Sequence, residues 1–93
     1  MSRKTVNFRR SAIENLPEAK PVLYRIQTEG GKTNYVGVAK KGRVQERIKE
    51  HLDSGEIPGV KVQIHQMPSI QDAVNAEARV IARTKPKYNE QGK

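Results

Sequence analysis

The sequence has no cysteine, no tryptophan and few aromatic residues of any kind. Without cysteine, the chain can form neither a disulfide nor a thiolate metal site. Its two histidines, His51 and His65, are too few for a histidine-rich zinc site. Three tyrosines and one phenylalanine also argue against a surface that binds single strands mainly by stacking.

Long apolar runs and acidic residues are scarce as well. No apolar run approaches the roughly 20 residues that a membrane-spanning helix needs. The first ten residues, MSRKTVNFRR, lack the apolar stretch of a secretory signal. Lysine and arginine number 18 against 10 acidic residues, a net charge of +8. We therefore expect a soluble, cytoplasmic protein with no membrane association and a polyanionic partner, although an acidic protein partner would explain the same charge.

With 93 residues, the chain is long enough for one small domain. Residues 1–10 are expected to form a basic tail that either frays or adds a short strand, and residues 11–93 to form the domain. Ser11 is placed to cap a short helix over residues 12–16.

A β-hairpin is predicted next. Segments 22–28 and 33–39 are rich in strand-forming residues and flank the turn sequence Glu-Gly-Gly-Lys. Gly37, inside the second of these strands, indicates the close approach of another backbone or of a ligand.

The second half of the chain predicts two longer helices around one more strand. Apolar residues every four positions indicate a helix over about residues 43–54, which Gly55 ends. Alternation over residues 59–66 indicates a third strand with one buried face. Ser69 is placed to cap a last helix that runs to about residue 84. This order predicts an α/β domain with a small, three-stranded, mainly antiparallel sheet flanked by helices.

Glu77 is the most unusual residue of the last predicted helix. At about 100° per residue it projects among Ile70, Val74 and Ile81, inside the apolar stripe. A carboxylate there is costly unless it is paired or binds a metal. A salt bridge, for example to Arg47, would explain it. A role as the ligand of a hard divalent cation such as Mg²⁺ would explain it equally, because one carboxylate, waters and a substrate phosphate can hold that ion.

Basic residues gather in and before the preceding helix. Arg47 and His51 lie four residues apart and therefore on one helix face. Most such pairs form a solvated flank, but the planar arginine fork also suits phosphate oxygens, and an imidazole beside it can transfer a proton. Lys40, Lys41 and Arg43 form a basic turn that is suited to contacts with a nucleic-acid backbone.

Tyr24 and Tyr35 lie on the two strands of the predicted hairpin. They are either ordinary strand aromatics or hydroxyl groups that position or deprotonate an attacking water. A phenol, with an ordinary pKa near 10, needs nearby cations to act as a base. Lys40, Lys41 and Arg43 are candidates to supply that positive field.

In this order and spacing the motifs resemble the GIY-YIG nuclease domain, over about residues 14–89. Asn15-Leu16-Pro17 resembles the segment that precedes the first motif in the excision-repair members. The pieces that match the family's own motifs are Val22-Leu23-Tyr24, Tyr35-Val36-Gly37, Arg47 with His51, Glu77, and Pro86 with Asn89.

The resemblance implies a three-stranded sheet and metal-dependent hydrolysis of DNA phosphodiester bonds. By this resemblance Glu77 would bind one divalent metal, Mg²⁺ or Mn²⁺. Tyr35 would act as the general base, and Tyr24 would support the water or the phosphate. Arg47 would stabilise the phosphoryl charge, His51 would assist proton transfer, and Asn89 would order the site.

Three departures from the family pattern bear on this interpretation. Val22 stands where the first motif has its glycine, and the segment 37–47 is slightly long. Val38 stands where some relatives have a lysine that lowers the pKa of the tyrosine, and Lys40 or Lys41 would have to replace it.

The sequence thus favours a stand-alone DNA endonuclease, which a partner protein could target to its substrate. The alternative is a nucleic-acid-binding module of the same fold with little or no activity. A structural domain that binds an acidic protein is the third and weakest hypothesis.

Overall fold

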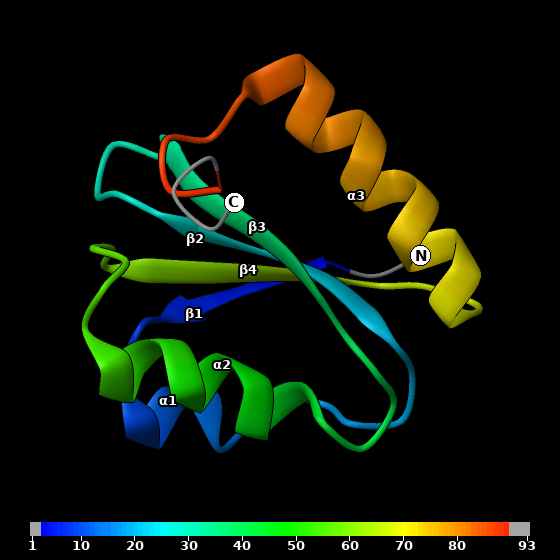
Figure 1. Ribbon diagram of the computed structural model, residues 1–93. Helices are drawn as coiled ribbons and strands as arrows, with labels where there is room; N and C mark the ends of the chain where they lie inside the picture. Colours follow the sequence, from blue (N-terminus) through cyan, green and yellow to red (C-terminus); the bar gives the residue numbers. More distant parts are fainter. Residues whose placement is uncertain (1–2, 90–93) are drawn as a thin grey trace.

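The computed structural model describes residues 3–89, which form one antiparallel sheet with helices on both of its faces (Figure 1). The strands lie in the order β1-β4-β2-β3, so that β1 and β3 are the edges. The elements are β1 (Arg3–Asn7), α1 (Arg10–Ile13), β2 (Val22–Gln27), β3 (Thr33–Ala39), α2 (Val44–Ser54), β4 (Lys61–Gln66) and α3 (Ile70–Thr84).

The prediction of an α/β domain is confirmed, but the prediction of three strands is wrong, because the sheet has four. The additional strand is β1, which pairs with β4 along its whole length. Residues 3–7 therefore form a short strand, which is one of the two possibilities expected for the N-terminal segment. Val6 lies opposite Val62 and packs with Phe8 against the core. The strand's other side chains are polar and exposed, which is why its apolar pattern was too weak to identify it.

The sheet buries apolar side chains on both faces. Alternate residues of β2 point to opposite sides, so that Tyr24 and Leu23 enter different cores. The larger core lies between one face and helices α1 and α2, and the smaller one lies between the other face and α3 (Figure 1). The residues buried against α3 and the sheet in the smaller core are Leu23, Val36, Met67, Ala73, Ala76 and Val80.

Local capping residues fix the ends of the two longer helices. Gly55 ends α2 in the left-handed conformation, with φ of 67°. The Ser69 side chain accepts a hydrogen bond from the Asp72 backbone N–H and caps α3, as expected. The prediction that Ser11 caps the first helix is wrong, because α1 begins at Arg10 and Ser11 lies inside it. Among residues 3–89, none of the helices is both long and apolar enough to span a bilayer.

Candidate active site

Tyr24 and Gly37 are paired across the β2–β3 hairpin, and the glycine makes room for the tyrosine ring. A Cβ atom at position 37 would collide with the hydroxyl oxygen and the outer ring carbons of Tyr24. The expected close approach at Gly37 therefore exists, but the neighbour is a side chain rather than a backbone or a ligand. The ring of Tyr24 is completely buried as a result.

Three rings meet where β2, β3 and α2 come together. The Tyr24 hydroxyl oxygen lies 2.7 Å from His51 Nε2, within hydrogen-bond distance. The ring centroid of Tyr35 lies 4.8 Å from that of His51 and 6.2 Å from that of Tyr24. Tyr35 is half-buried and is the more accessible of the two tyrosines. The sequence prediction that these residues lie together is thus consistent with the geometry.

Arg47 lies one turn before His51 on α2 and acts electrostatically on the whole cluster. Burial raises the pKa of Tyr24 and of Tyr35 above the ordinary value, and it lowers the pKa of His51. The positive charge of Arg47 pulls each of these pKa values downward. Its guanidinium is about half exposed and has a weak ion pair with Glu50 at 3.5 Å. Arg47 is therefore open to an anionic ligand from solvent.

Arg47 is also the cation that acts on Tyr35, a role for which the sequence had suggested Lys40, Lys41 or Arg43. The net effect on Tyr35 is nevertheless a raised pKa, because burial outweighs the arginine. At neutral pH the phenol of Tyr35 therefore keeps its proton.

Glu77 acts on the same tyrosines from α3, the helix that covers the other face of the sheet. Burial raises the pKa of its carboxyl group and Arg47 lowers it, while the carboxylate in turn raises the pKa of both tyrosines. Within residues 3–89, the Glu77 side chain forms no ion pair at 4.0 Å or less. The direct salt bridge to Arg47, one of the two explanations offered by the sequence, is thus absent from the described residues, although the two charges influence one another.

The position of Glu77 on α3 differs from the expectation. The stripe that packs on the sheet consists of Ala73, Ala76 and Val80, and Glu77 lies at its half-buried border. Ile70 and Val74, expected in the buried stripe, are 37% and 44% exposed.

The residues present fit a hard cation that keeps most of its water. In the part of the chain from Arg3 to Asn89, no three histidine, aspartate or glutamate side chains gather as a ready metal cage. One half-exposed carboxylate without an ion-pair partner is enough for Mg²⁺ or Mn²⁺ when waters and a substrate phosphate complete the coordination. Glu77 meets that requirement.

Asn89 acts on the backbone of β3. Its Nδ2 donates to the Val36 carbonyl oxygen at 2.9 Å, and its Oδ1 accepts from the Val36 N–H at 2.8 Å. The Tyr88 N–H donates to the Asn34 carbonyl oxygen, and Pro86 is completely buried. These contacts tie residues 86–89 to the edge strand that carries Tyr35. Both ends of the Asn89 amide are engaged, so it is a positioning residue.

The basic turn joins the site only in part. A cavity of about 320 Å³ adjoins Arg47, with Lys40 and Arg43 on one side and the exposed Ile70 and Val74 on the other. Lys41 is exposed but does not line this cavity. Arg43 also pairs with Glu46 at 3.0 Å. The apolar wall formed by Ile70 and Val74 was missed from the sequence, because both residues were expected in the core.

Comparisons with known proteins add no family to these observations: no family model matches the chain, and no curated protein matches it. The relation to GIY-YIG nucleases stays a prediction from motifs.

Proposed function

We propose that the protein is a divalent-metal-dependent nuclease that hydrolyses DNA phosphodiester bonds. The observation that supports this most is that the rings of Tyr24, Tyr35 and His51 meet, while the charges of Arg47 and Glu77 act on both tyrosines. These residues come from four different elements, and each is of a type that phosphodiester hydrolysis uses. A purely structural cluster would not need an accessible arginine and a carboxylate without an ion-pair partner beside a Tyr–His hydrogen bond.

Arg47 and Glu77 have complementary roles in this proposal. The guanidinium of Arg47 binds two phosphate oxygens and stabilises the negative charge that grows as water attacks. Glu77 would hold Mg²⁺ or Mn²⁺, which would supply positive charge to the phosphate when bound. The positive charge of Lys40 and Arg43, in the adjoining cavity, attracts the neighbouring phosphates of the strand.

His51 and Tyr35 share the handling of water. Burial lowers the pKa of His51, so that its imidazole is neutral at pH 7 and able to accept a proton. We therefore assign proton acceptance to His51 and orientation of the water to the protonated hydroxyl of Tyr35. The Tyr24 hydroxyl holds the imidazole in place. The water oxygen bonds to phosphorus, and its proton passes to His51. One ester P–O bond breaks, and the leaving sugar oxygen takes a proton from solvent water. Tyr35 as the base is the second candidate.

The alternative is a nucleic-acid-binding module with little or no activity. Two observations favour it: Val38 stands where a helpful lysine is missing, and the pKa of Tyr35 is raised rather than lowered. The same net charge of +8 would support binding without cleavage.

Cleavage of labelled nucleic acid tests the proposal. Single-stranded, duplex and branched DNA, and RNA, are incubated with the protein in Mg²⁺, in Mn²⁺ and in EDTA. We expect metal-dependent cutting that Glu77→Ala abolishes and that the matched control Glu29→Ala, on the exposed hairpin turn, retains. Equal trace activity in wild type and Glu77→Ala, or no cutting of any substrate, would reject the nuclease. Salt-sensitive binding in both would then identify the binding module.

A further inference from the structure

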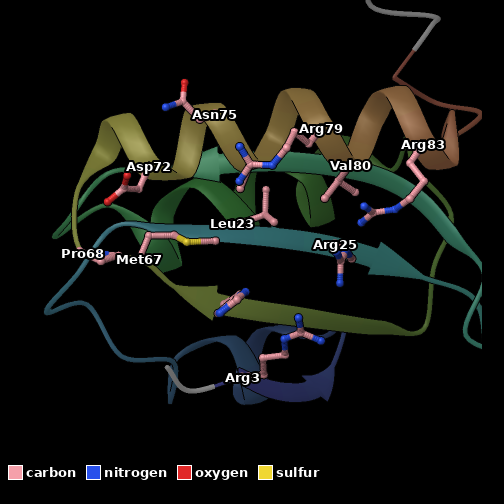
Figure 2. A pocket seen from close by; sticks show the side chains of 12 residues that line it. Arg3, Leu23, Arg25, Met67, Pro68, Asp72, Asn75, Arg79, Val80 and Arg83 are labelled. Carbon is pink, nitrogen blue, oxygen red and sulfur yellow. The ribbon is translucent and has the colours of Figure 1, made fainter.

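A second cavity, of about 450 Å³, lies on the other flank of α3, over the part of the sheet that α3 leaves uncovered (Figure 2). Its lining combines an apolar floor, which includes Leu23 and Val80, with basic side chains from four elements. We call it the arginine groove and define it by its basic residues, which are Arg3, Arg25, His65, Arg79 and Arg83.

The sheet register brings the first three of these residues onto one face. His65 lies on β4, opposite Arg3 on the neighbouring strand β1 and opposite Leu23 on the other neighbouring strand, β2. Arg25 follows Leu23 by two residues and shares its face. Leu23 belongs to the core under α3, so this is the α3 face of the sheet.

The arginines of α3 complete the groove from the helix side. Arg79 and Arg83 lie four residues apart, about one turn, and both point from α3 toward the groove (Figure 2). Glu77 precedes Arg79 by two residues, about 200° around the helix. The candidate active site and the arginine groove therefore occupy opposite flanks of α3.

The positive charge of the groove is poorly compensated. In the stretch from Arg3 to Asn89, the ion pairs use Arg10, Arg43, Arg47 and Lys49, and none of the groove's arginines. The lining includes one acidic residue, Asp72. Arg25 donates to the neutral Gln63 side chain at 2.9 Å. Burial lowers the pKa of Arg25, and the charges of Arg3 and Arg83 lower it further.

We propose that the arginine groove binds the phosphodiester backbone of a nucleic-acid strand, as a contact surface separate from the candidate active site. Arginine forks bind phosphate oxygens in two places. The groove is open, and its guanidinium groups come from both walls (Figure 2). Arg79 and Arg83 are spaced about 6 Å along the helix axis and can contact different phosphates. A chain of phosphates uses this spread of charge better than one small anion does.

Strand binding in EDTA tests this inference without requiring cleavage. The affinity of a fluorescein-labelled DNA single strand and of a matching duplex is measured by anisotropy over a series of salt concentrations. The variant is Arg79→Ala with Arg83→Ala, because alanine preserves the helix. The matched control is Arg9→Ala with Lys32→Ala, which removes the same charge from exposed residues outside both cavities. Melting curves establish that all variants are folded.

We expect the groove variant to bind duplex at least about tenfold more weakly than the wild type. The slope of log binding constant against log salt concentration should become shallower by roughly 1.8, about 0.9 for each lost phosphate contact. The control should keep the wild-type slope. An unchanged slope in the groove variant, or an equal loss in both variants, would overturn the inference.

Two further measurements distinguish a bound strand from a small anion, and the groove from the candidate active site. In the first, inorganic tripolyphosphate is titrated calorimetrically into the wild type and the groove variant. If the loss of Arg79 and Arg83 weakens tripolyphosphate binding but not strand binding, the ligand of the groove is a small anion and the assignment of a strand is wrong. Because strand binding is measured in EDTA, where no metal-dependent cleavage takes place, the result for the groove does not depend on Glu77. Loss of cleavage in Glu77→Ala concerns the proposed nuclease alone, so the two proposals can fail separately.

Discussion

The hydroxyl of Tyr24 is held from two sides, by Gly37 below its ring and by His51 at its oxygen. The chain therefore needs a glycine at position 37 for steric reasons, because the tyrosine ring occupies the space of a Cβ atom. The same contact fixes where the imidazole of His51 lies.

Gly37→Ala should consequently damage both stability and activity. The new methyl group forces the Tyr24 ring away from His51, and overpacking of this kind costs about 1–3 kcal/mol of unfolding free energy. Denaturant unfolding measures the stability and a cleavage assay the activity. Gly30→Ala is the control, since its Cβ would have nothing within 4 Å. Equal stability of the two variants would show that the ring moves aside freely.

The pH dependence of kcat/KM distinguishes the two candidate bases. The pKa of His51 lies below its ordinary 6.5, so a histidine base predicts activity that rises through a pH below 6.5 and is level at neutral pH. A Tyr35 base predicts activity that keeps rising beyond pH 10, because burial raises the tyrosine's pKa. We expect the first profile. His51→Gln should remove the acidic limb, and Tyr35→Phe should retain it at a lower rate.

The residues of the site were predicted better than their surroundings. The rings of Tyr24, Tyr35 and His51 lie together, and Arg47 and Glu77 act electrostatically on both tyrosines. That these residues form an active site stays a prediction. The helical spacing predicted that Glu77 lies inside the apolar stripe of α3, whereas it lies at the border of the buried stripe. The prediction failed because the apolar residues of α3 are compatible with two different buried faces. Of the apolar residues expected in the buried stripe, Ala73 is buried, whereas Ile70 and Val74 are exposed. The residues that pack on the sheet are Ala73, Ala76 and Val80.

At the scale of elements, the end of the described chain stabilises the edge of the sheet. Residues 86–89 lie beside β3, and Asn89 pairs with both backbone groups of Val36 as a neighbouring strand would. The edge strand that carries Tyr35 is thus fixed on both sides, by β2 and by this segment.

Asn89→Ala should therefore loosen β3. It leaves the N–H and the carbonyl of Val36 without their partner, at a cost of about 1–3 kcal/mol. Hydrogen exchange of the Val36 amide should become faster, and cleavage should decrease with little change in KM. Asn15→Ala, which removes a single exposed side-chain hydrogen bond, serves as the control. Unchanged Val36 protection would contradict a positioning role for Asn89.

Elements with strong local signals were predicted closely, and those that depend on partners were not. Gly55 and Ser69 mark the ends of α2 and α3 through their own backbone and side-chain chemistry. β1 carries no such signal, because its polar residues form a strand only where the backbone of β4 is available to pair with it.

For the whole molecule, the burial of Glu77 should lower folding stability where its carboxylate is charged. Its pKa is raised above the ordinary 4.5, so the charged form is disfavoured in the folded state. In EDTA, Glu77→Gln should raise Tm at pH 7, and the gain should vanish as the pH falls below 4.5, where the carboxyl group is neutral in both states. Thermal melts at several pH values measure this effect, with Glu29→Gln as the control.

Added Mg²⁺ should reverse that order. A cation that binds the folded state stabilises it, so Mg²⁺ should raise the Tm of the wild type and leave that of Glu77→Gln unchanged. Identical Mg²⁺ responses of the two proteins would exclude Glu77 as the cation's ligand.

The overall charge pattern shows where sequence reasoning stops. The net charge of +8 predicts a polyanionic partner but does not indicate where on the surface such a partner would bind. The basic turn could be identified from the sequence, because Lys40, Lys41 and Arg43 lie within four consecutive positions. The arginine groove combines side chains from β1, β2, β4 and α3. In the sequence, its one local signal is the four-residue spacing of Arg79 and Arg83, which is equally typical of a solvated helix face.

The single-turnover rate of DNA cleavage in Mg²⁺ is the most direct measurement of the proposed activity, compared for wild type, Arg47→Ala, Glu77→Ala and the double variant. We expect each single change to lower the rate by about 100-fold or more. The double variant should be little slower than the worse single one, because residues that act as a unit give non-additive losses. A wild-type rate in either single variant, or no cleavage by the wild type, would contradict a phosphodiesterase site built around Arg47.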